Sequence, residues 1–346
     1  MGIVVLPADL AADRTAIIRF LREHLTPESN EERFEWLYLN CPLGFARAWL
    51  ARDSKLDALI GVGAAFPRRM SVCGIVYSCW VLGDFCIRED YRSLGPALLL
   101  QRACLSIVEN DNATFCYDYP GKGMMAIYRR LGVSAQGQWV RFAKPLRVDR
   151  MVRKIVHNDR LTKGISAAGN RLLGLRNHVH RSSPMTSVAF HQGRLDEEFT
   201  HLSQRLAARF RVCGHRTAEY LNWRFLDNPM TRCRILTARH GSELMAYAVI
   251  SATNEEAVLL DLFGDSESGA VRDLLTALPE TLRDEQISNL SFHSLDSNPW
   301  ISSLLKMGFY RRESAPFVVH ARPESPLSGA ITDNRDWFLT QGDRDS

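Results

Sequence analysis

A Gly-containing loop that could bind an anion follows an apolar run in the first third of the chain. The run spans residues 79–87, and residues 92–97 (Arg-Ser-Leu-Gly-Pro-Ala) open a segment, 97–108, with helical periodicity. Main-chain N–H groups in such a loop at a helix N-terminus bind anions, and the helix dipole favours negative charge there. A pyrophosphate is the ligand that this arrangement fits best.

Pro96 takes one donor away from this loop, because proline has no N–H. If Gly95 is the N-cap, Pro96 is the first helical residue, where proline is sterically favoured. We therefore expect the loop to bind a phosphate with one donor fewer and with lower affinity.

The pattern Arg92-x-x-Gly95-x-Ala97 between a strand and a helix resembles the acetyl-CoA signature of the GCN5-related N-acetyltransferases, [Gln/Arg]-x-x-Gly-x-[Gly/Ala]. Tyr128, four residues before Gly132, adds to the resemblance, which covers most of residues 1–145. It implies acetyl-CoA or another acyl-CoA as cofactor, and a strand that splays from its neighbour so that its main chain pairs with the pantetheine arm. The implied cofactor-binding residues are Phe85, Cys86, Ile87, Arg92, Ser93, Leu94, Gly95 and Ala97.

Two side chains near the implied thioester are candidates for proton transfer. An alkyl amine is mostly protonated at neutral pH, so a base assists its attack on a carbonyl. Asp84 lies in the apolar strand beside the expected cleft, where desolvation would raise its pKa, and it is our candidate base. Tyr128 lies where the family often has a tyrosine acid. Tyr117 and Asp118, which precede a Pro-Gly turn, are candidates for binding the acceptor.

Each of these residues also has a purely structural interpretation. Asp84 could bind a neighbouring main-chain group, Tyr128 could only pack, and Tyr117 with Asp118 could belong to the turn. The sequence alone leaves both interpretations open.

The chain carries an internal repeat. Residues 36–42 (Trp-Leu-Tyr-Leu-Asn-Cys-Pro) align with 223–229 (Trp-Arg-Phe-Leu-Asp-Asn-Pro), and two apolar helix tails end at Gly132 and Gly308. The first copy has predicted strands at 46–52, 59–66, 79–87 and 114–119 and helices at 97–108 and 124–131. The second has strands at 234–238, 245–251, 257–263 and 289–293 and a helix at 271–282. This order predicts an α/β (α+β) fold with mixed sheets, in two tandem units resembling acyl-CoA N-acyltransferases.

The second copy lacks the features that would hold a cofactor. Its matching loop, residues 264–269, carries Asp265 and Glu267, which would repel a pyrophosphate, and Leu304 stands at the position of Tyr128. Asp261 matches Asp84, which favours a structural role for that aspartate in both copies. We expect the second unit to be a non-catalytic partner that shapes the acceptor cleft.

Composition and charge set the remaining expectations. Residues 147–182 hold nine Lys/Arg and two Asp, a net +7, so the rest of the chain sums to −3. The predicted domains are 1–147, a basic and partly helical linker at 148–184, 185–322, and a tail at 323–346, whose Trp-Phe-Leu stretch suggests docking on the body. The sequence has no apolar stretch long enough to span a membrane, no signal-peptide pattern and no CxxC pair. His178 and His180 have no cysteine or carboxylate at the spacing of metal ligands. We expect a cytoplasmic protein with buried free thiols and without a bound metal.

Together these patterns predict a CoA-dependent N-acyltransferase acting on a small-molecule amine, with no nucleic acid partner. The duplication and the Trp–Pro motif are similar to tandem acetyltransferase-like proteins of bacterial exopolysaccharide clusters, which implies an amino-sugar acceptor. Two alternatives stay open. One is a non-catalytic adaptor that docks on a membrane or protein through the basic linker, and the other is an N-acyl amino acid synthase that uses long acyl chains.

Overall fold

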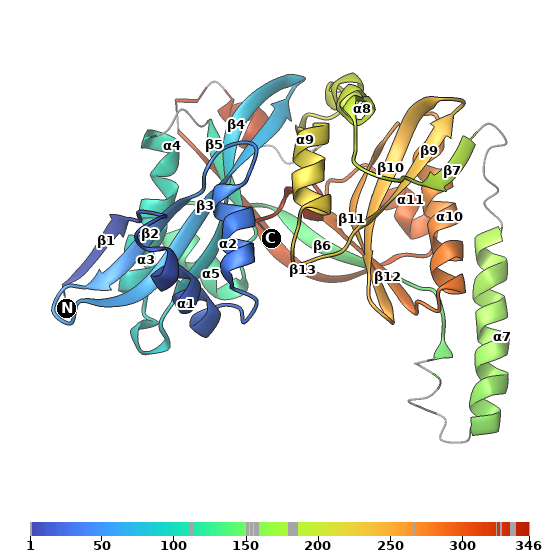
Figure 1. Cartoon of the computed structure of the whole chain (residues 1–346), viewed down its shortest axis with the longest axis horizontal. Coiled ribbons are helices and arrows are strands. Elements are labelled where there is room, and N and C mark those ends of the chain that lie inside the picture. The colour runs from blue at the N-terminus through green and yellow to red at the C-terminus, as the bar shows by residue number, and fades with distance from the viewer. Residues whose placement is uncertain are drawn as a thin grey trace.

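The computed structural model describes residues 2–110, 114–149, 152, 155, 159–178, 186–265, 267–322, 324–325, 327–332 and 337–345. Within them the two predicted units are present side by side (Figure 1), one built from the first part of the chain and one from the second. A single mixed sheet runs through both, in the order β1-β2-β3-β4-β5-β13-β6-β12-β11-β10-β9-β7. The predicted fold class is confirmed.

The first unit has a meander followed by strand–helix–strand–helix. Its elements are β1 (Ile3–Pro7), α1 (Arg14–His24), α2 (Glu31–Phe34), the π-helix η1 (Glu35–Leu39), β2 (Arg47–Asp53), β3 (Ala58–Val72), β4 (Ile75–Ile87), the 3-10 turn η2 (Glu89–Tyr91), α3 (Leu94–Leu105), α4 (Ile107–Asn110), β5 (Phe115–Asp118), α5 (Lys122–Arg130) and β6 (Ala135–Pro145).

The second unit repeats this order after α7 (Asp159–His178). Its elements are β7 (Thr186–Phe190), α8 (Glu197–Ala207), β8 (Val212–Gly214), α9 (Ala218–Leu221), the π-helix η3 (Asn222–Leu226), β9 (Arg234–His240), β10 (Glu243–Ala252), β11 (Glu256–Gly264), α10 (Ala270–Asp284), β12 (Asn289–Leu295), α11 (Ile301–Lys306) and β13 (Tyr310–Ala321). The tail adds α12 (Ser328–Thr332), β14 (Trp337–Phe338) and the 3-10 turn η4 (Gln341–Asp343).

The predicted strands and helices are all present, with ends that differ by a few residues. The main differences are that β3 continues to Val72, six residues beyond its predicted end, and that β4 begins at Ile75. The first long helix stops at Leu105, before the separate turn α4. Both predicted glycine stops are confirmed, because Gly132 and Gly308 have φ of +79° and +88°, a conformation that glycine adopts without strain.

The two units exchange one strand each at the centre of the sheet. β13, from the second unit, lies between β5 and β6 of the first, and β6 in turn pairs with β12 of the second. Both strands are visible as the long ribbons that cross the middle of Figure 1. Each unit therefore completes its sheet with a strand of the other.

Trp36 and Trp223, the landmarks of the repeat, meet across the junction. Each lies in a π-helix, and the rings stack with centroids 5.3 Å apart and an interplanar angle of 26°. The Trp36 indole N–H donates to the carbonyl of Trp223 at 2.9 Å, and that of Trp223 donates to the carbonyl of Trp36 at 3.0 Å. The repeated motif thus forms a near-symmetric contact between the units.

The tail docks on the body, as its apolar residues suggested. Trp337, Phe338 and Leu339 are fully buried, and β14 pairs in parallel with β8, which itself pairs with β3 of the first unit. The tail therefore contacts both units, and Figure 1 shows its end at the centre of the molecule.

The cysteines are free, and Cys41, Cys79, Cys86, Cys104, Cys116 and Cys213 are buried as expected, whereas Cys73 is exposed and Cys233 is partly buried. Much of the basic linker, including Arg150, Arg153 and Lys154, lies outside the described residues. Among the helices that the structure does describe, none has the length and apolar character needed to cross a membrane.

Candidate functional site

The edge of β4 is open beyond Val81. β4 pairs with β3 along its whole length, but it pairs with β5 only at Trp80 and Val81. Asp84 has φ of +45°, and the register of the β3–β4 pair shifts at this point, which marks a bulge. The splayed strand implied by the family resemblance is therefore present, because β5 does not pair with the last residues of β4. At the end of the strand the Ile87 carbonyl accepts from Nε of Arg92 at 3.1 Å.

α3 lies close against β3 because the strand has glycine at the contact. A Cβ atom added to Gly63 would lie 2.7 Å from Sγ of Cys104 on α3. Glycine at this position lets α3, the helix that follows the anion-binding loop, pack closely against β3.

A groove of about 530 Å³ lies along this open edge. It is bounded by β4, by the loop before α3 and by one face of α5. Seven of the eight predicted cofactor-binding residues line it, namely Phe85, Cys86, Ile87, Arg92, Ser93, Leu94 and Ala97. The eighth, Gly95, has open space in front of it, because a Cβ placed there would have no atom within 4 Å. The groove fits an extended chain that ends in a pyrophosphate.

The position of Pro96 in α3 was predicted wrongly. The helix begins at Leu94 and its N-cap is Ser93, which has extended φ and ψ of −133° and 169°, so Pro96 is the third helical residue and not the first. The Ser93 N–H donates to the carbonyl of Tyr91 at 2.6 Å. The N–H groups of Leu94 and Gly95 therefore stay as the donors of this loop toward an anion.

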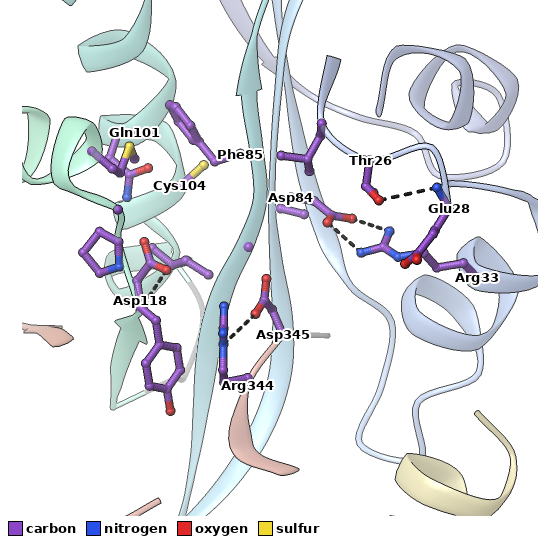
Figure 2. Close-up of a pocket in the computed structure, with 18 residues that line it drawn as sticks. Thr26, Glu28, Arg33, Asp84, Phe85, Gln101, Cys104, Asp118, Arg344 and Asp345 are labelled. Carbon is purple, nitrogen blue, oxygen red and sulfur yellow. Dashed lines mark hydrogen bonds and ion pairs between the residues drawn. The ribbon is translucent and has the colours of Figure 1, made fainter. Parts of the chain in front are cut away.

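A second cavity, of about 480 Å³, adjoins the groove and shares Leu25 and Phe85 with it. Figure 2 shows its polar residues, with Asp118 on one side and Asp84 with Arg33 on the other. An acyl chain laid along the groove would reach this cavity at Phe85.

Asp118 is the carboxylate of this cavity best suited to exchange a proton. Burial raises the pKa of Asp118 to about 7, and the negative charge of Asp345 acts in the same direction. The hydroxyl of Tyr128 donates to its Oδ2 at 2.6 Å and the main-chain N–H of Tyr119 donates to its Oδ1 at 2.7 Å, which partly offset the effect. A carboxyl group with this pKa takes and returns protons at neutral pH.

Asp84 also lines the cavity, but its oxygens already have partners. The guanidinium of Arg33 donates to Oδ1 and Oδ2 at 2.8 Å each, and the hydroxyl of Tyr38 donates to Oδ2 at 2.7 Å. Asp84, Arg33 and Tyr38 are all buried. A base role for Asp84 stays a prediction, and this geometry favours a structural role.

Asp261, the matching residue of the second unit, is held in the same way. It accepts hydrogen bonds from Arg216, Tyr247 and Thr340 and is buried. The two guanidinium groups come from different places, three residues before Trp36 for Arg33 and seven before Trp223 for Arg216. The matching aspartates of the two units, Asp84 and Asp261, are therefore each paired with an arginine, and the two arginines come from positions that do not match in the repeat.

Two of the predicted site residues do not face either cavity. The ring of Tyr128 is fully buried, and its hydroxyl accepts from the amide of Gln101 at 2.9 Å while it donates to Asp118. Tyr117 is also buried, and its hydroxyl donates to the main-chain carbonyl of Asp343 at 2.6 Å. Tyr128 can thus reach a substrate only through Asp118, and Tyr117 anchors the tail.

The loop of the second unit has its own cation. Arg209 forms ion pairs with Asp265 at 2.6 Å and with Glu267 at 3.5 Å. The two acids that distinguish this loop from residues 92–97 are therefore paired with an arginine of the same unit, and the absence of a pyrophosphate site there stays a prediction.

Sequence reasoning missed Arg33, Gln101, Arg344 and Asp345, which line the second cavity. Arg33 lies on α2, a short helix that was not predicted, and Gln101 lies on α3. The only signal for Arg344 and Asp345 was the apolar stretch just before them, which predicted docking but gave no target.

Comparison with known proteins supports the fold and goes no further. No family model matches the chain, and no curated protein matches it. Among solved structures, a probable N-acyltransferase from Enterococcus faecalis V583 is similar with a TM-score of 0.66 at 10% identity, over 93% of this chain and 73% of that one. A GCN5-related N-acetyltransferase from Anabaena variabilis ATCC 29413 has a TM-score of 0.67 at 12% identity, over 92% and 73%.

A third similar structure shares the duplication. It is a tandem GNAT protein from the clavulanic acid biosynthesis pathway, with a TM-score of 0.57 at 13% identity, over 92% of this chain and 98% of that one. The chain therefore has the fold of a tandem GCN5-related N-acetyltransferase over most of its length.

Proposed function

We propose that the first unit of this chain transfers an acyl group from CoA to the nitrogen of an amine. The observation that carries this proposal is the junction of the two cavities at Phe85, with the groove along open β4 on one side and Asp118 on the other. A donor site and a base for an acceptor thus lie next to each other.

The groove residues would hold the acyl-CoA at two places. The main chain of β4 would pair with its pantetheine arm, and the loop before α3 would bind its phosphates. The open edge of β4 has no strand partner at Phe85 and Cys86, and the Ile87 carbonyl accepts from Nε of Arg92 at 3.1 Å. Leu94 and Gly95 are the first two residues of α3, and their N–H groups would bind the phosphates. An acyl-CoA supplies a thioester carbonyl that an amine can attack. Acetyl is the acyl group that we propose from the signature.

Asp118 would act on the acceptor. In the transfer a C–N bond forms and the C–S bond breaks. An alkylammonium ion gives up one proton before its nitrogen attacks and a second as the amide forms, and one of these two protons goes to the sulfur. Asp118 takes a proton from the nitrogen, since its pKa of about 7 lets it accept at neutral pH. The Gln101–Tyr128–Asp118 chain of hydrogen bonds holds the carboxyl group in place.

The donor half of the proposal is tested by calorimetry with CoA and acetyl-CoA. We expect the wild type to bind both, and Gly95→Trp and Arg92→Glu to weaken binding at least tenfold, because one fills the open space before the loop and the other adds a charge that repels phosphate. Arg272→Glu, at the start of α10 in the second unit, is the matched control and should bind as the wild type does. A wild type that binds neither acetyl-CoA nor palmitoyl-CoA would contradict the proposal.

The acceptor half is tested by following free CoA thiol with a panel of amines. Turnover with acetyl-CoA supports an acetyltransferase, and turnover only with palmitoyl-CoA favours the long-chain alternative. Binding of CoA without turnover on any amine favours the adaptor alternative, in which residues 147–182 contact a membrane or protein. The amino-sugar acceptor and the link to exopolysaccharide synthesis stay predictions, and glucosamine belongs in the panel for that reason.

A further inference from the structure

The last described residues of the tail are fixed in place by both units. The carbonyl of Gly342 accepts from Tyr220 at 3.0 Å and from Arg224 at 3.1 Å, and that of Arg344 accepts from Arg68 at 2.7 Å. Together with the bond from Tyr117 to the Asp343 carbonyl, these donors satisfy the main chain of the turn η4. A segment held this way is a built part of the structure and not a loose end.

A buried ion pair adds a side-chain anchor to these main-chain contacts. The Asp343 carboxylate lies 2.8 Å from the guanidinium of Arg216, and both groups are almost fully buried. Thr340 caps the turn, since its side chain accepts from the N–H of Gly342 and its own N–H donates to Asp343. The direction in which residues 344 and 345 leave the turn is therefore set by the second unit through Asp343 and Gly342, and by the first unit through Arg68 and Tyr117.

These two residues enter the acceptor cavity of the first unit. Figure 2 shows Arg344 and Asp345 between Asp118 and Asp84, and both line the cavity. Asp345 also fits tightly against β4, because a Cβ added to Gly83 would lie 2.6 Å from the Cβ of Asp345. The tail thus forms one wall of the cavity, and Gly83 makes room for it.

The charged side chains that line the second cavity favour the binding of a cation. Of the residues that the structure describes, the cavity has the carboxylates of Glu28, Asp84, Asp118 and Asp345 and the guanidinium groups of Arg33 and Arg344. Arg33 is paired with Asp84 at 2.8 Å, and Arg344 lies over the ring of Tyr119 at 5.2 Å, with its Nε 3.6 Å from Asp345. The carboxylates outnumber the guanidinium groups, so an ammonium ion gains from entering.

We infer that residues 344 and 345 determine acceptor specificity, and that Asp345 binds the incoming amine as its ammonium ion beside Asp118. The class of acceptor is a primary ammonium ion without a carboxylate next to it, because a carboxylate there would face Asp118 and Asp345. This inference rests on the proposed function. It also gives the second unit a task, which is to hold the tail that completes the site of the first.

Asp345→Asn tests the inference in the intact chain. With ethanolamine, glucosamine and spermidine as probe amines, we expect KM to rise at least tenfold for each amine that the wild type acylates, while the Kd for acetyl-CoA stays unchanged. Asp57→Asn, in the exposed turn between β2 and β3, is the matched loss of one carboxylate and should change neither quantity. An unchanged KM in Asp345→Asn would overturn the inference and leave the proposed function standing.

A second readout does not depend on turnover. We expect the NMR titration of the Asp118 carboxyl carbon, assigned with Asp118→Asn, to move to lower pH in Asp345→Asn, because the neighbouring negative charge that raises its pKa is gone. No movement would overturn the placement of Asp345 beside Asp118, even in a protein that failed every transfer assay.

Deletion of residues 344–346 shows whether the tail recognises the acceptor amine or obstructs the cavity that the amine enters. If the tail recognises the acceptor, the shortened protein keeps its affinity for acetyl-CoA and loses kcat/KM for the probe amines, and glycine rises relative to ethanolamine as an acceptor. A gain of kcat/KM on ethanolamine would mean that the tail obstructs the cavity, and would overturn the inference.

Discussion

The hydroxyl of Tyr128 donates a 2.6 Å hydrogen bond to Oδ2 of Asp118, and this places a fully buried tyrosine of α5 behind a carboxylate that lines the second cavity. The pair therefore has one member that can touch a substrate and one that can act only through it. This division of roles separates the predictions for the two residues.

Asp118→Asn should reduce kcat by about 10²–10⁴-fold, the usual contribution of a general base. The wild-type rate should rise with pH through about 7 as Asp118 loses its proton, and the variant should lack this limb. Rates across pH 5–9 and acetyl-CoA calorimetry check both points. A variant that keeps the wild-type pH profile would assign the base to another group.

The same substitution should stabilise the protein at alkaline pH. The pKa of Asp118 is raised in the fold above its ordinary value, so the fold binds this proton more tightly than the unfolded chain does. Its stability contribution is present at pH 4 and is lost as the pH rises to about 7. At pH 8 we expect the unfolding free energy of Asp118→Asn to exceed that of the wild type by an amount on the order of 4 kcal/mol, with no gain at pH 4. Urea unfolding at the two pH values measures this.

Tyr128→Phe should shift the pH profile and not the maximal rate. The hydrogen bond from the tyrosine hydroxyl lowers the pKa of Asp118, so removal of the hydroxyl raises that pKa. The pH at which the rate rises should then move to a higher value. If Tyr128 were instead the acid that protonates the leaving thiolate, as the family resemblance implies, the plateau at high pH would fall. The ratio of plateau rates decides between the two roles.

Local patterns predicted the parts of the site that are local in sequence. The loop from Arg92 to Ala97, the strand before it and the glycine stops follow from residues within about ten positions of each other. The opening of that strand was implied only by the family resemblance. The Asp84–Arg33 pair and the approach of Asp345 to Asp118 join residues far apart in the chain, and no periodicity encodes them. The position of Pro96 failed for a different reason, because Ser93 and Gly95 are both acceptable N-caps and only the backbone angles of Ser93 decide between them.

Asp84→Asn should cost stability and spare catalysis. It leaves the buried guanidinium of Arg33 without a charged partner, which costs about 3–5 kcal/mol. Asp261→Asn is the matched change in the second unit, and it should cost less because Arg216 keeps its ion pair with Asp343 at 2.8 Å.

Turnover per folded molecule separates the two possible roles of Asp84. We expect kcat/KM within tenfold of the wild type for the folded fraction, measured below the melting transition. Should Asp84→Asn fail to fold, the double variant Arg33→Met with Asp84→Leu removes both charges, and such replacements are often neutral for stability. A folded variant of either kind that has lost 10²-fold or more of the rate would restore Asp84 as the base.

The strand exchange predicts that the two units cannot fold separately. A fragment of residues 1–147 lacks β13, so β5 and β6 would have no strand between them and would expose two unpaired edges. A fragment of residues 185–346 lacks β6, so β12 and β13 would lose their shared neighbour. We expect each fragment alone to aggregate or to show little fixed structure by circular dichroism, and the co-expressed pair to copurify as one folded complex. A first fragment that is monomeric, cooperatively folded and able to bind acetyl-CoA would contradict this, because it would show that the first unit closes its sheet without the second.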